Sequence, residues 1–422
     1  MRQSEFEGKK LKITLFSYVF WPETFVVNDL VESLISKGHQ VEVSTSLPNY
    51  QSGSFQDGYG LLNGPYSETW NEAVIKRFPV VSRKKGFVAL ALNYLTNIVF
   101  GFLNLFRLRR SDVVLVYGTS PLIAFLPAVF FKRFFKVPMV IWYQDLWPDS
   151  FFAVIKTNKL SFLKPVLERV VRFIYSQTDI MLVQNHLFNE NLERLGFAKR
   201  RLTIYNWSLV EETQAVQVGV AKNTPEWIDQ LPQGKKLMTF AGNIGKVQGI
   251  AQILEVAKLI EQSHRELHFV FVGEGSFLQE AKNMSQKLAN VTWVDRKPLS
   301  DMPYLFAKSD LMIVSLSAEP AMSMVIPGKL QAYFAAGKPV LGFINGAAAD
   351  IIKEACAGFV AQAENTDELI HAVEMFARMT KGDLNQLGQN ARLFYERSFS
   401  KDKVISQIES ELISIVEKYR RR

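Results

Sequence analysis

Residues Met322–Phe343, "MSMVIPGKLQAYFAAGKPVLGF", contain the signals for a complete helix and the strand that follows it. Pro327 suits the first helical position, where its missing N–H costs nothing. Gly337 suits the left-handed position after the last turn, and the apolar run from Val340 predicts a buried strand. Lys329 falls in the predicted first turn, beside N–H groups that carry about half a positive charge. The stretch therefore predicts a helix N-terminus that meets a phosphate or diphosphate, and the alternative is a helix that is merely well capped.

Outward from this stretch, short apolar segments alternate with helix-like segments along both halves of the chain. Nearly all-apolar strands between helices are typical of parallel sheets covered on both faces. We therefore expect an α/β protein of two doubly wound, Rossmann-like domains, whose ligand-binding edges face each other across a cleft. The predicted strands are residues 11–19, 39–46, 112–118, 138–145 and 179–185 in the first half, and 236–242, 267–273, 291–295, 310–316 and 339–343 in the second.

The domain boundary is predicted near residue 210, where a polar stretch without periodicity follows "IYNWS". The domains are then residues 1–209 and 210–399, and residues 400–422 predict an amphipathic helix with a basic end. The single cysteine, Cys356, excludes an internal disulfide and suits a reducing compartment. Because the first apolar run lacks a small-residue cleavage site, we expect no secretory signal and a cytoplasmic protein.

The stretch from Arg83 to Val137 is strongly basic and rich in Phe and Leu. It holds nine basic residues and one acid, so it alone carries a charge equal to the +8 of the whole chain. Nucleic acid would explain the charge but not the apolar residues, whereas an anionic membrane surface explains both. We therefore expect residues 83–137 to contact the inner face of the plasma membrane peripherally, and we expect no nucleic-acid partner.

Residues 86–106 are uncharged and long enough to span a bilayer. Asn93, Asn97 and Asn104 would form a narrow polar stripe on such a helix. Because polar groups inside a membrane are costly without partners, we expect a helix packed on its own domain with one face on the membrane. A spanning helix and a plain core helix stay open as alternatives.

Two turns of the second half combine glycines with the ends of predicted strands. The turn in "FAGNIGKVQGI" opens a helix, so its N–H groups can approach a phosphate while Lys246 adds charge. The turn in "FVGEGSFL" lacks the third glycine of a dinucleotide fingerprint, so it is a weak NAD signature. The alternative for the first of these turns is a tight turn that needs glycine. The donor-binding residues predicted in these turns are Gly242, Asn243, Gly245, Gly273 and Gly275.

Acidic side chains follow two predicted strands of the first half. Asp145, in "WYQDLWPDS", stands beside Trp142 and Trp147, and a carboxylate beside aromatic rings suits hydrogen bonding to sugar hydroxyls. The alternative is that Asp145 caps the following helix. Glu23, in "FWPETF", has the same two interpretations, and Thr24 is expected to be the helix cap there.

The sequence offers little for other chemistries. It contains no Asp-x-Asp motif for a metal–diphosphate pair and no glycine-flanked serine elbow. His264 and His268 lack a third ligand, so we expect them at the surface rather than on a metal, and we expect no metal site. His186, after a predicted strand, is placed to line the cleft.

In combination, these motifs resemble the retaining glycosyltransferases of family 4, which have the GT-B fold. The resemblance covers nearly the whole chain. The forms "QDLWPDS" and "GNIGKVQG" are similar to the bacterial surface-polysaccharide branch, including colanic-acid-type and N-acetyl-L-fucosamine transferases. The motifs that carry it are, in order, "FWPETFVVNDLVESLISKGHQVEV", "LPNYQSG", "YQDLWPDS", "IYNWS", "FAGNIGKVQGI", "FVGEGS" and "PGKLQAYFAAGKPVLG".

This resemblance implies metal-independent transfer of a sugar, with retention of configuration and without a cofactor. The donor would be a UDP-sugar, with UDP-N-acetyl-L-fucosamine favoured, and the acceptor a polyprenyl-diphosphate-linked sugar in O-antigen, capsule or exopolysaccharide synthesis. The second domain would hold the donor and the first the acceptor, and the final helix would pack back on the first. Lys246 and Lys329 would neutralise the diphosphate leaving group. The other implied residues are Asp145 and Glu319 at the reaction centre, Arg296, Ser323 and Pro327 on the donor, and Glu23, Thr24 and Trp147 on the acceptor side.

The chain departs from the family pattern in three places. Met324 and Ala332 stand where two glutamates are common, so the usual ribose-binding carboxylate is absent and Glu319 is the candidate replacement. Gln144 stands where histidine is frequent, so Asp145 is expected to contact the transferred sugar. The usual glycine pair is missing from the first loop. A sugar-nucleotide 2-epimerase of the same architecture and a non-catalytic partner in polysaccharide assembly therefore stay open.

Overall fold

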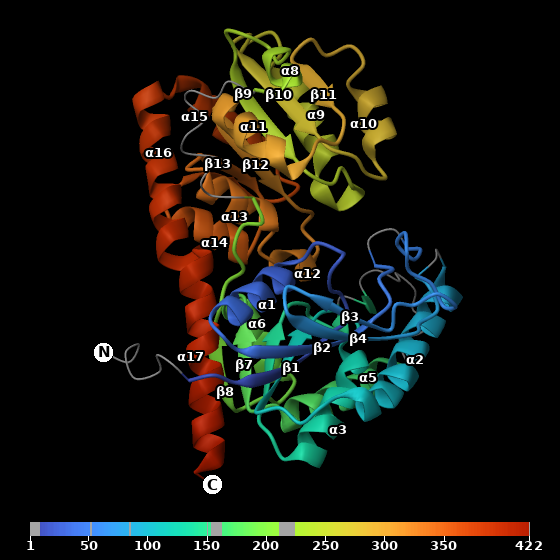
Figure 1. Cartoon of the computed structure of the whole chain (residues 1–422). Coiled ribbons are helices and arrows are strands. Elements are labelled where there is room, and N and C mark those ends of the chain that lie inside the picture. Colours follow the sequence, from blue (N-terminus) through green and yellow to red (C-terminus); the bar gives the residue numbers. More distant parts are fainter. Residues whose placement is uncertain are drawn as a thin grey trace. The chain divides into compact units, whose positions relative to one another are not determined.

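The computed structural model describes residues 9–50, 53–83, 86–149, 151–152, 163–210 and 224–421. The chain divides into two compact units. The N-terminal unit comprises Met1–Tyr205 together with Asp402–Arg422, and the C-terminal unit comprises Asn206–Lys401. The chain thus leaves the N-terminal unit at Tyr205 and returns to it with its last helix (Figure 1).

The N-terminal unit is built on an eight-stranded sheet with the order β3-β4-β2-β1-β5-β6-β7-β8. All neighbouring strands are parallel except β3, which runs antiparallel to β4. The order reverses between β1 and β5, the topological switch point of a doubly wound sheet. The strands are β1 (Lys12–Ser17), β2 (Gln40–Ser46), β3 (Ser67–Trp70), β4 (Ala73–Phe78), β5 (Val113–Gly118), β6 (Met139–Tyr143), β7 (Ile180–Val183) and β8 (Arg200–Thr203).

Helices cover both faces of this sheet, which is why its central strands are apolar throughout (Figure 1). The last helix is fastened at its end by ion pairs, Arg420 to Asp112 at 2.6 Å among them. The helices of this unit are α1 (Val26–Ser36), α2 (Phe87–Asn104), η1 (Leu105–Arg107), η2 (Leu122–Phe125), α3 (Leu126–Phe135), α5 (Lys164–Gln177), α6 (His186–Arg194) and α17 (Lys401–Arg420).

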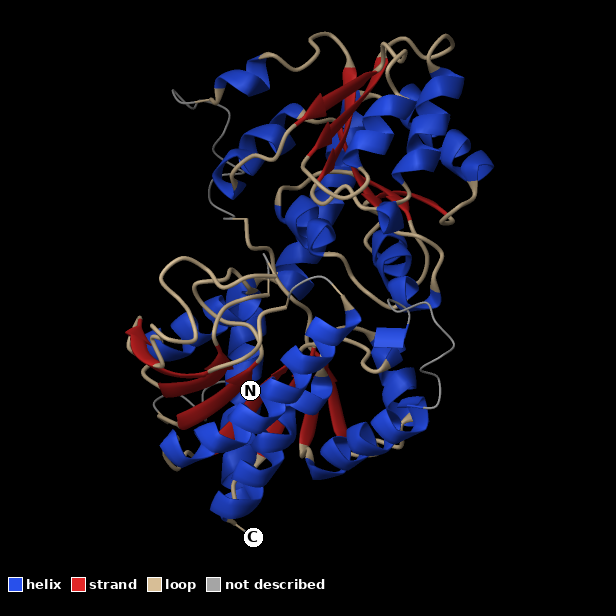
Figure 2. Cartoon of the chain, turned by 90° about the vertical axis from the view of Figure 1, so that its right-hand side faces the viewer, coloured by secondary structure: helices blue, strands red, loops and turns tan. Residues whose placement is uncertain are grey.

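The C-terminal unit has a six-stranded parallel sheet with the order β11-β10-β9-β12-β13-β14 and helices on both faces (Figure 2). Its switch point lies between β9 and β12, so a ligand is expected beyond the carboxyl ends of these two strands. The strands are β9 (Lys236–Ala241), β10 (Leu267–Val272), β11 (Val291–Val294), β12 (Leu311–Ser315), β13 (Val340–Phe343) and β14 (Gly358–Ala361).

The helices of this unit pack aliphatic and aromatic side chains on that sheet, in a core that includes Phe240, Phe271 and Phe343. The helices are α8 (Glu226–Asp229), η5 (Lys246–Gln248), α9 (Ile250–Ile260), α10 (Leu278–Met284), η6 (Leu299–Asp301), α11 (Met302–Lys308), α12 (Pro320–Ser323), α13 (Gly328–Ala335), α14 (Ala347–Glu354), α15 (Thr366–Arg378), α16 (Lys381–Phe394) and the π-helix η7 (Tyr395–Phe399).

The structure confirms the α/β class and a strand in each of the ten predicted segments. It adds four short strands, β3, β4, β8 and β14, that the apolar pattern does not show. Two of them contain basic residues, as "AVIKRF" in β4 and "RRLT" in β8, and β3, β8 and β14 are edge strands with a face open to water.

The opening stretch folds as expected, with one correction. Gly337 adopts the left-handed conformation, at φ +62°, directly after the helix, and Val340 begins β13. Pro327, however, is the N-cap residue of α13 and not its first helical residue, because its ψ of 136° is extended. Lys329 is therefore the second residue of the helix.

Helix α2 has a polar inner face and an apolar outer face. The predicted stripe of Asn93, Asn97 and Asn104 is buried, with Asn104 donating to the Ser44 hydroxyl at 2.9 Å. By length and composition α2 could cross a membrane, and only 28% of its most apolar window is buried, whereas the core helix of a soluble protein is mostly buried. The outer face carries a stripe of exposed side chains, continued by η1 and α3, that we call the apolar stripe: Val88, Leu92, Leu95, Val99, Leu103, Phe106, Phe130 and Phe134.

The basic residues near the apolar stripe do not all face solvent. Lys132 is largely buried and pairs with Asp179 at 2.5 Å, which corrects its expected place on the membrane surface. Burial lowers the pKa of Lys132. Lys84 and Lys85 lie outside the described residues. The exposed cations in this stretch are Arg107, Arg109, Arg110, Arg133 and Lys136.

Candidate functional site

Lys329 lies directly against the turn that follows β9. A Cβ atom at Gly242 would lie 2.5 Å from the Cε of Lys329, so only glycine leaves room for the lysine. The Lys329 Nζ lies 3.5 Å from the centroid of the Phe240 ring and donates to the Oε1 of Gln248 at 3.0 Å. The structure thus brings together the two turns that the sequence predicted as a phosphate-binding pair, at the switch point of the C-terminal sheet.

The Lys329 ammonium group has no carboxylate partner among the described residues. Burial lowers the pKa of Lys329 to about 7. Lys329 is half-buried, and a cation that contacts a neutral amide and an aromatic face in such a place is poorly compensated, so an anion would supply the missing charge. Such groups mark functional sites when they lie at a ligand-binding edge.

The position of Lys329 is fixed by Tyr333, one turn later in α13. The Tyr333 hydroxyl accepts from the Ala241 N–H at 3.1 Å and donates to the Ala241 carbonyl at 3.2 Å. Gln248 is held in turn, because the Ser315 hydroxyl at the end of β12 donates to its carbonyl. Residues from β9, β12 and α13 therefore hold the lysine and its amide partner in place.

The loops after β9 and β10 pack backbone against backbone. Gly242 N–H donates to the Val272 carbonyl and Ile244 N–H to the Glu274 carbonyl, both at 2.8 Å. A Cβ at Gly273 would lie 2.0 Å from the Gly242 oxygen. A Cβ at Gly275 would lie 2.3 Å from the oxygen of Ile244. Both glycines thus allow the two loops to pack closely, and this packing positions the candidate phosphate-binding turn.

The other predicted cations of this edge are exposed. Lys246 is 75% exposed and pairs at 3.9 Å with Glu280, and Arg296 pairs at 2.7 Å with Glu274. Neither makes a described contact with Lys329. Exposed ion pairs are weak, so both side chains can leave these partners at little cost in free energy. They would have to leave them to contact a ligand at this edge of the sheet. Asn243, beside them, is also exposed, whereas Gly245 is buried.

The loop after β12 carries Glu319 and Ser323 at opposite ends of α12. Glu319 is the N-cap residue, and its carbonyl accepts from the Ser323 N–H at 3.2 Å. A Cβ at Gly346 would lie 2.1 Å from the Ser323 oxygen, so this loop packs on the turn after β13. Glu364, after β14, accepts from the Ala318 N–H at 3.2 Å and brings a second carboxylate beside Glu319.

The two positions where the family has glutamates are occupied differently. Ala332 is buried in the second turn of α13, and Met324 follows the last residue of α12. These two positions therefore supply no carboxylate, whereas Glu319 and Glu364 follow β12 and β14 at the same edge of the sheet.

On the N-terminal unit, Glu23 is a buried connector. Its Oε1 accepts from the Tyr50 N–H at 2.7 Å and its carbonyl accepts from the Asn28 amide at 2.7 Å. It therefore joins the loops after β1 and β2. Thr24 is not the helix cap, because α1 begins at Val26 and its N-cap residue is Phe25.

Asp145 is half-buried beyond the end of β6, whereas the tryptophans beside it belong to the core. Trp147 is 1% exposed and packs on Phe151, which corrects its expected place on the acceptor side. A ring so fully covered has no surface to offer a ligand. Gln144 accepts through its Oε1 from the Gln184 amide at 2.8 Å, which ties the ends of β6 and β7 together.

The histidines hold no metal-like arrangement. His268 contacts the Thr292 hydroxyl at 2.8 Å, and burial lowers its pKa to about 4. His264 lies 3.2 Å from Glu266. No group of three or more His, Cys, Asp or Glu that could hold a metal occurs in the described part of the chain. His186 is the exposed first residue of α6.

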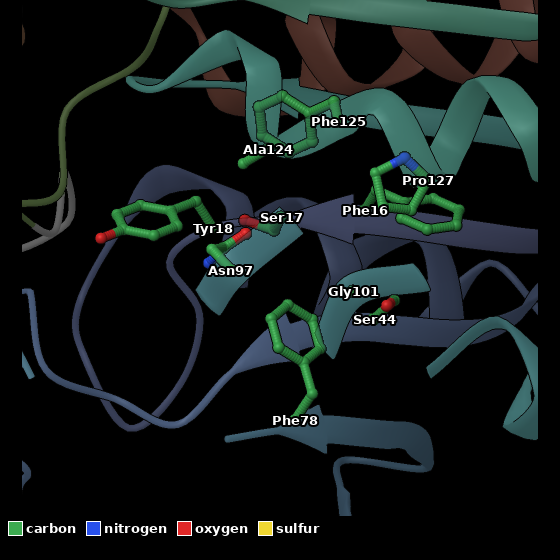
Figure 3. A pocket seen from close by; sticks show the side chains of 10 residues that line it. All are labelled: Phe16, Ser17, Tyr18, Ser44, Phe78, Asn97, Gly101, Ala124, Phe125 and Pro127. Atoms are coloured by element: carbon green, nitrogen blue, oxygen red, sulfur yellow. The ribbon is translucent and has the colours of Figure 1, made fainter. Parts of the chain in front are cut away.

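A small cavity lies beneath α2, against β1 and η2 (Figure 3). Its volume is about 10 Å³, which is room for about one water molecule and not for a sugar. The candidate residues of the N-terminal unit, such as Glu23 and Asp145, are not among those that line this cavity. It is lined by Phe16, Ser17, Tyr18, Ser44, Phe78, Asn97, Gly101, Ala124, Phe125 and Pro127.

Four site residues were missed by sequence reasoning: Phe240, Gln248, Tyr333 and Glu364. Gln248 stands two residues after Lys246, in the turn that opens a helix, and its polar side chain there is a signal that could have been used. Phe240 and Tyr333 read as ordinary core residues, and nothing in the sequence distinguishes Glu364 from other surface acids.

Comparison with known proteins supports a two-part architecture. Residues 24–207 match the family "Glycosyl transferase 4-like domain", and residues 223–394 match "Glycosyl transferases group 1". "Probable glycosyltransferase WbjE" of Pseudomonas aeruginosa is 26% identical over 301 residues, 70% of this chain and 72% of that protein. "Putative colanic acid biosynthesis glycosyl transferase WcaI" of Escherichia coli K12 is 22% identical over 420 residues, 95% of this chain and 100% of that protein.

Among solved structures, Anabaena Alr3699/HepE in complex with UDP and glucose superimposes with a TM-score of 0.65 at 16% identity. The match covers 96% of this chain and 100% of that one. Together with the two parallel sheets, this likeness shows the GT-B fold.

Proposed function

We propose that this chain, a polysaccharide-type glycosyltransferase of the GT-B fold, transfers a sugar from a UDP-sugar to a polyprenyl-diphosphate-linked acceptor. Transfer retains the anomeric configuration and uses neither metal nor cofactor. The product enters O-antigen, capsule or exopolysaccharide synthesis, and N-acetyl-L-fucosamine is the favoured sugar. The observation that carries the proposal is the half-buried Lys329 ammonium group, which has no carboxylate partner in the described part of the chain and lies at the switch point of the C-terminal sheet.

The position of Lys329 suits a nucleotide diphosphate as the ligand. As the glycosidic bond to the donor breaks, negative charge grows on the diphosphate, and a fixed cation in a partly dry site stabilises that charge strongly. The solved relative was obtained with UDP, and the relatives matched over most of their length are named as glycosyltransferases. Glu319 and Glu364 are the proposed contacts for the ribose, in place of the missing family glutamate.

The apolar stripe supports a lipid-linked acceptor. A soluble protein gains nothing by exposing side chains such as Leu95, Leu103 and Phe106 on one helix face. Cations at the ends of that face, including Arg109 and Arg110, suit anionic lipid head groups. We therefore place the protein peripherally on the inner face of the plasma membrane, with α2 lying in the interface.

The double variant Leu95→Glu/Leu103→Glu is expected to lose binding to vesicles that contain phosphatidylglycerol. Each leucine contributes about 1.5–3 kcal/mol when buried, so affinity should fall by more than about tenfold. Sedimentation with vesicles at low salt measures this. The matched control is Leu259→Glu/Leu393→Glu, which changes two equally exposed leucines of the C-terminal unit and should bind as the unchanged protein does. Equal binding by both double variants would remove the membrane from the proposal.

Incubation with membrane extract and radiolabelled sugar nucleotides is expected to move label into the lipid fraction. A thermal-shift screen across UDP- and GDP-sugars ranks the donors first, because a ligand at 100-fold its Kd stabilises by about 2.7 kcal/mol. A protein that binds a UDP-sugar but labels no lipid would refute lipid-linked transfer. Conversion of the donor to its epimer without acceptor, detected by NMR, would instead identify a 2-epimerase.

A further inference from the structure

Asn93, on the inner face of α2, joins three loops at the carboxyl edge of the N-terminal sheet. Its Oδ1 accepts from the hydroxyl of Tyr18, which follows β1. Its Nδ2 donates to the Asn49 side chain, after β2, at 3.2 Å and to the Val81 carbonyl, after β4, at 2.5 Å. Asn93 itself is fully buried. Helix α2 therefore contacts these three loops through its inner face and carries the apolar stripe on its outer face.

Arg83 is the cation held by these loops. Its N–H donates to the Asn49 Oδ1 at 3.2 Å, and its guanidinium lies 4.4 Å from the centroid of the Tyr50 ring. The side chain is half-buried, and it forms no ion pair with an Asp or Glu in the described part of the chain. The nearby acid Glu23 is buried and already accepts from the Tyr50 N–H.

Tyrosines surround this guanidinium. Burial lowers the pKa of Arg83, but the neighbouring hydroxyls of Tyr50, Tyr18 and Tyr94 raise it by more. The Tyr18 ring lines the rim of the small cavity while its hydroxyl points away from it, as Figure 3 shows. The guanidinium has five N–H groups and no carboxylate partner in the described part of the chain, so it is the hydrogen-bond donor here for oxygen-rich anions.

Asp145 lies on the same side of the sheet. Burial raises the pKa of Tyr94 to about 12, Arg83 opposes this and the charge of Asp145 adds to it, so both residues are electrostatic neighbours of Tyr94. Tyr94 is a buried residue of α2 and stands directly before Leu95, which belongs to the exposed apolar stripe. In a lipid-linked acceptor the diphosphate joins the lipid to the first sugar, so its anchor must stand between a membrane-facing element and a sugar-binding carboxylate.

We propose that Arg83 binds the diphosphate of the lipid-linked acceptor, at the point where α2 delivers it from the membrane to the loops of the N-terminal sheet. This inference rests on the proposed function. Arg83 is a binding residue for the acceptor and takes no part in donor binding. A guanidinium suits this task, because its planar set of N–H donors can hold two phosphate oxygens at once.

The test uses Arg83→Met in the full chain, without membranes. Binding of geranyl diphosphate, measured by titration calorimetry, should weaken by about tenfold or more because a charge-assisted pair is lost. Arg83→Lys should restore part of that affinity, and affinity for UDP should stay unchanged in both variants. The control is Arg133→Met, an arginine of this unit that also lies over an aromatic ring, 5.5 Å from the Phe173 centroid, but is exposed. It should bind geranyl diphosphate as the unchanged protein does.

Steady-state kinetics provide a second measurement, which a purely structural role of Arg83 would not change. With a short-chain, diphosphate-linked sugar as acceptor, Arg83→Met should raise the acceptor KM by about tenfold with kcat nearly unchanged. Unaltered binding of geranyl diphosphate by Arg83→Met, or equal binding of geraniol, would overturn the inference. Because the calorimetry needs no sugar transfer, failure to find any donor would refute the proposed function while leaving this measurement decisive for Arg83.

Discussion

Replacement of Lys329 by methionine is expected to lower kcat/KM for the UDP-sugar by about 10²–10³-fold, the loss typical when a donor that stabilises transition-state charge is removed. Methionine has a similar length and keeps the contact with the Phe240 ring, so the change removes the charge and its hydrogen bond to Gln248. Steady-state transfer assays and UDP titration measure the two effects, and affinity for UDP should also fall by about tenfold or more.

The same variant should show an altered pH dependence of stability. The pKa of Lys329 is lowered from its ordinary value of 10.5 to about 7 by burial. Between pH 7 and 10.5 the unfolded chain therefore binds more protons than the folded chain, and the free energy of unfolding rises with pH across this window. The shift corresponds to roughly 4–5 kcal/mol at most. Lys329→Met should lack this rise, and at pH 7 and below it should be more stable than the unchanged protein.

Binding of UDP is expected to take up a proton at pH 8. The diphosphate charge favours the ammonium form, so the pKa of Lys329 rises in the complex and a proton is bound. Calorimetry in two buffers with different ionisation enthalpies measures this uptake, which should vanish in Lys329→Met.

The control for both measurements is Lys338→Met, a second buried lysine of the C-terminal unit, which donates to the Ser309 carbonyl at 2.9 Å. It should lose stability but keep UDP affinity. If Lys329→Met binds UDP as tightly as the unchanged protein, the assignment of the donor site is wrong.

Replacement of Gly273 by alanine is expected to destabilise the C-terminal unit by about 3 kcal/mol or more. The new Cβ would lie 2.0 Å from the Gly242 oxygen, and the φ of +143° is unfavourable for any residue with a side chain. Since both loops are tied by backbone hydrogen bonds, the clash can be relieved only by moving the turn that holds Lys329. UDP affinity should fall together with a decrease in Tm of about 8 °C or more.

The matched control is Gly234→Ala. Gly234 also has a positive φ, at +70°, but nothing lies within 4 Å of the position its Cβ would take. It isolates the backbone strain, which costs roughly 1–2 kcal/mol, from the clash. Both variants are measured by thermal and urea unfolding. Equal stability of the two would mean that the loops after β9 and β10 do not pack as closely as described.

Much of the fold could be predicted because it depends on short-range patterns. Segments such as 112–118 and 267–273 are nearly all apolar, which is typical of parallel strands buried on both faces. Gly337 and Val340 likewise mark a helix end and a strand start through their own conformational preferences. The strands missed, such as β8, owe their conformation to a neighbouring strand and not to their own composition.

The candidate site could be predicted only in part. The sequence placed Lys329 and Gly242 at two strand or helix ends, and parallel strands bring such ends to one edge. It could not show that Gln248 is the partner of Lys329, or that Lys246 points to Glu280 instead. Pairings of this kind depend on side chains from elements far apart in the sequence.

By itself, the sequence determined that this chain is an α/β protein with two parallel sheets, because periodicity and turn residues act over a few neighbouring positions. The tertiary structure alone decided which charged and aromatic groups are covered. Trp147 and Lys132 are buried, whereas Phe106 is 89% exposed, although all three stand in similarly apolar segments. Burial depends on what the rest of the fold packs above a residue, and burial is what leaves Lys329 a poorly compensated cation.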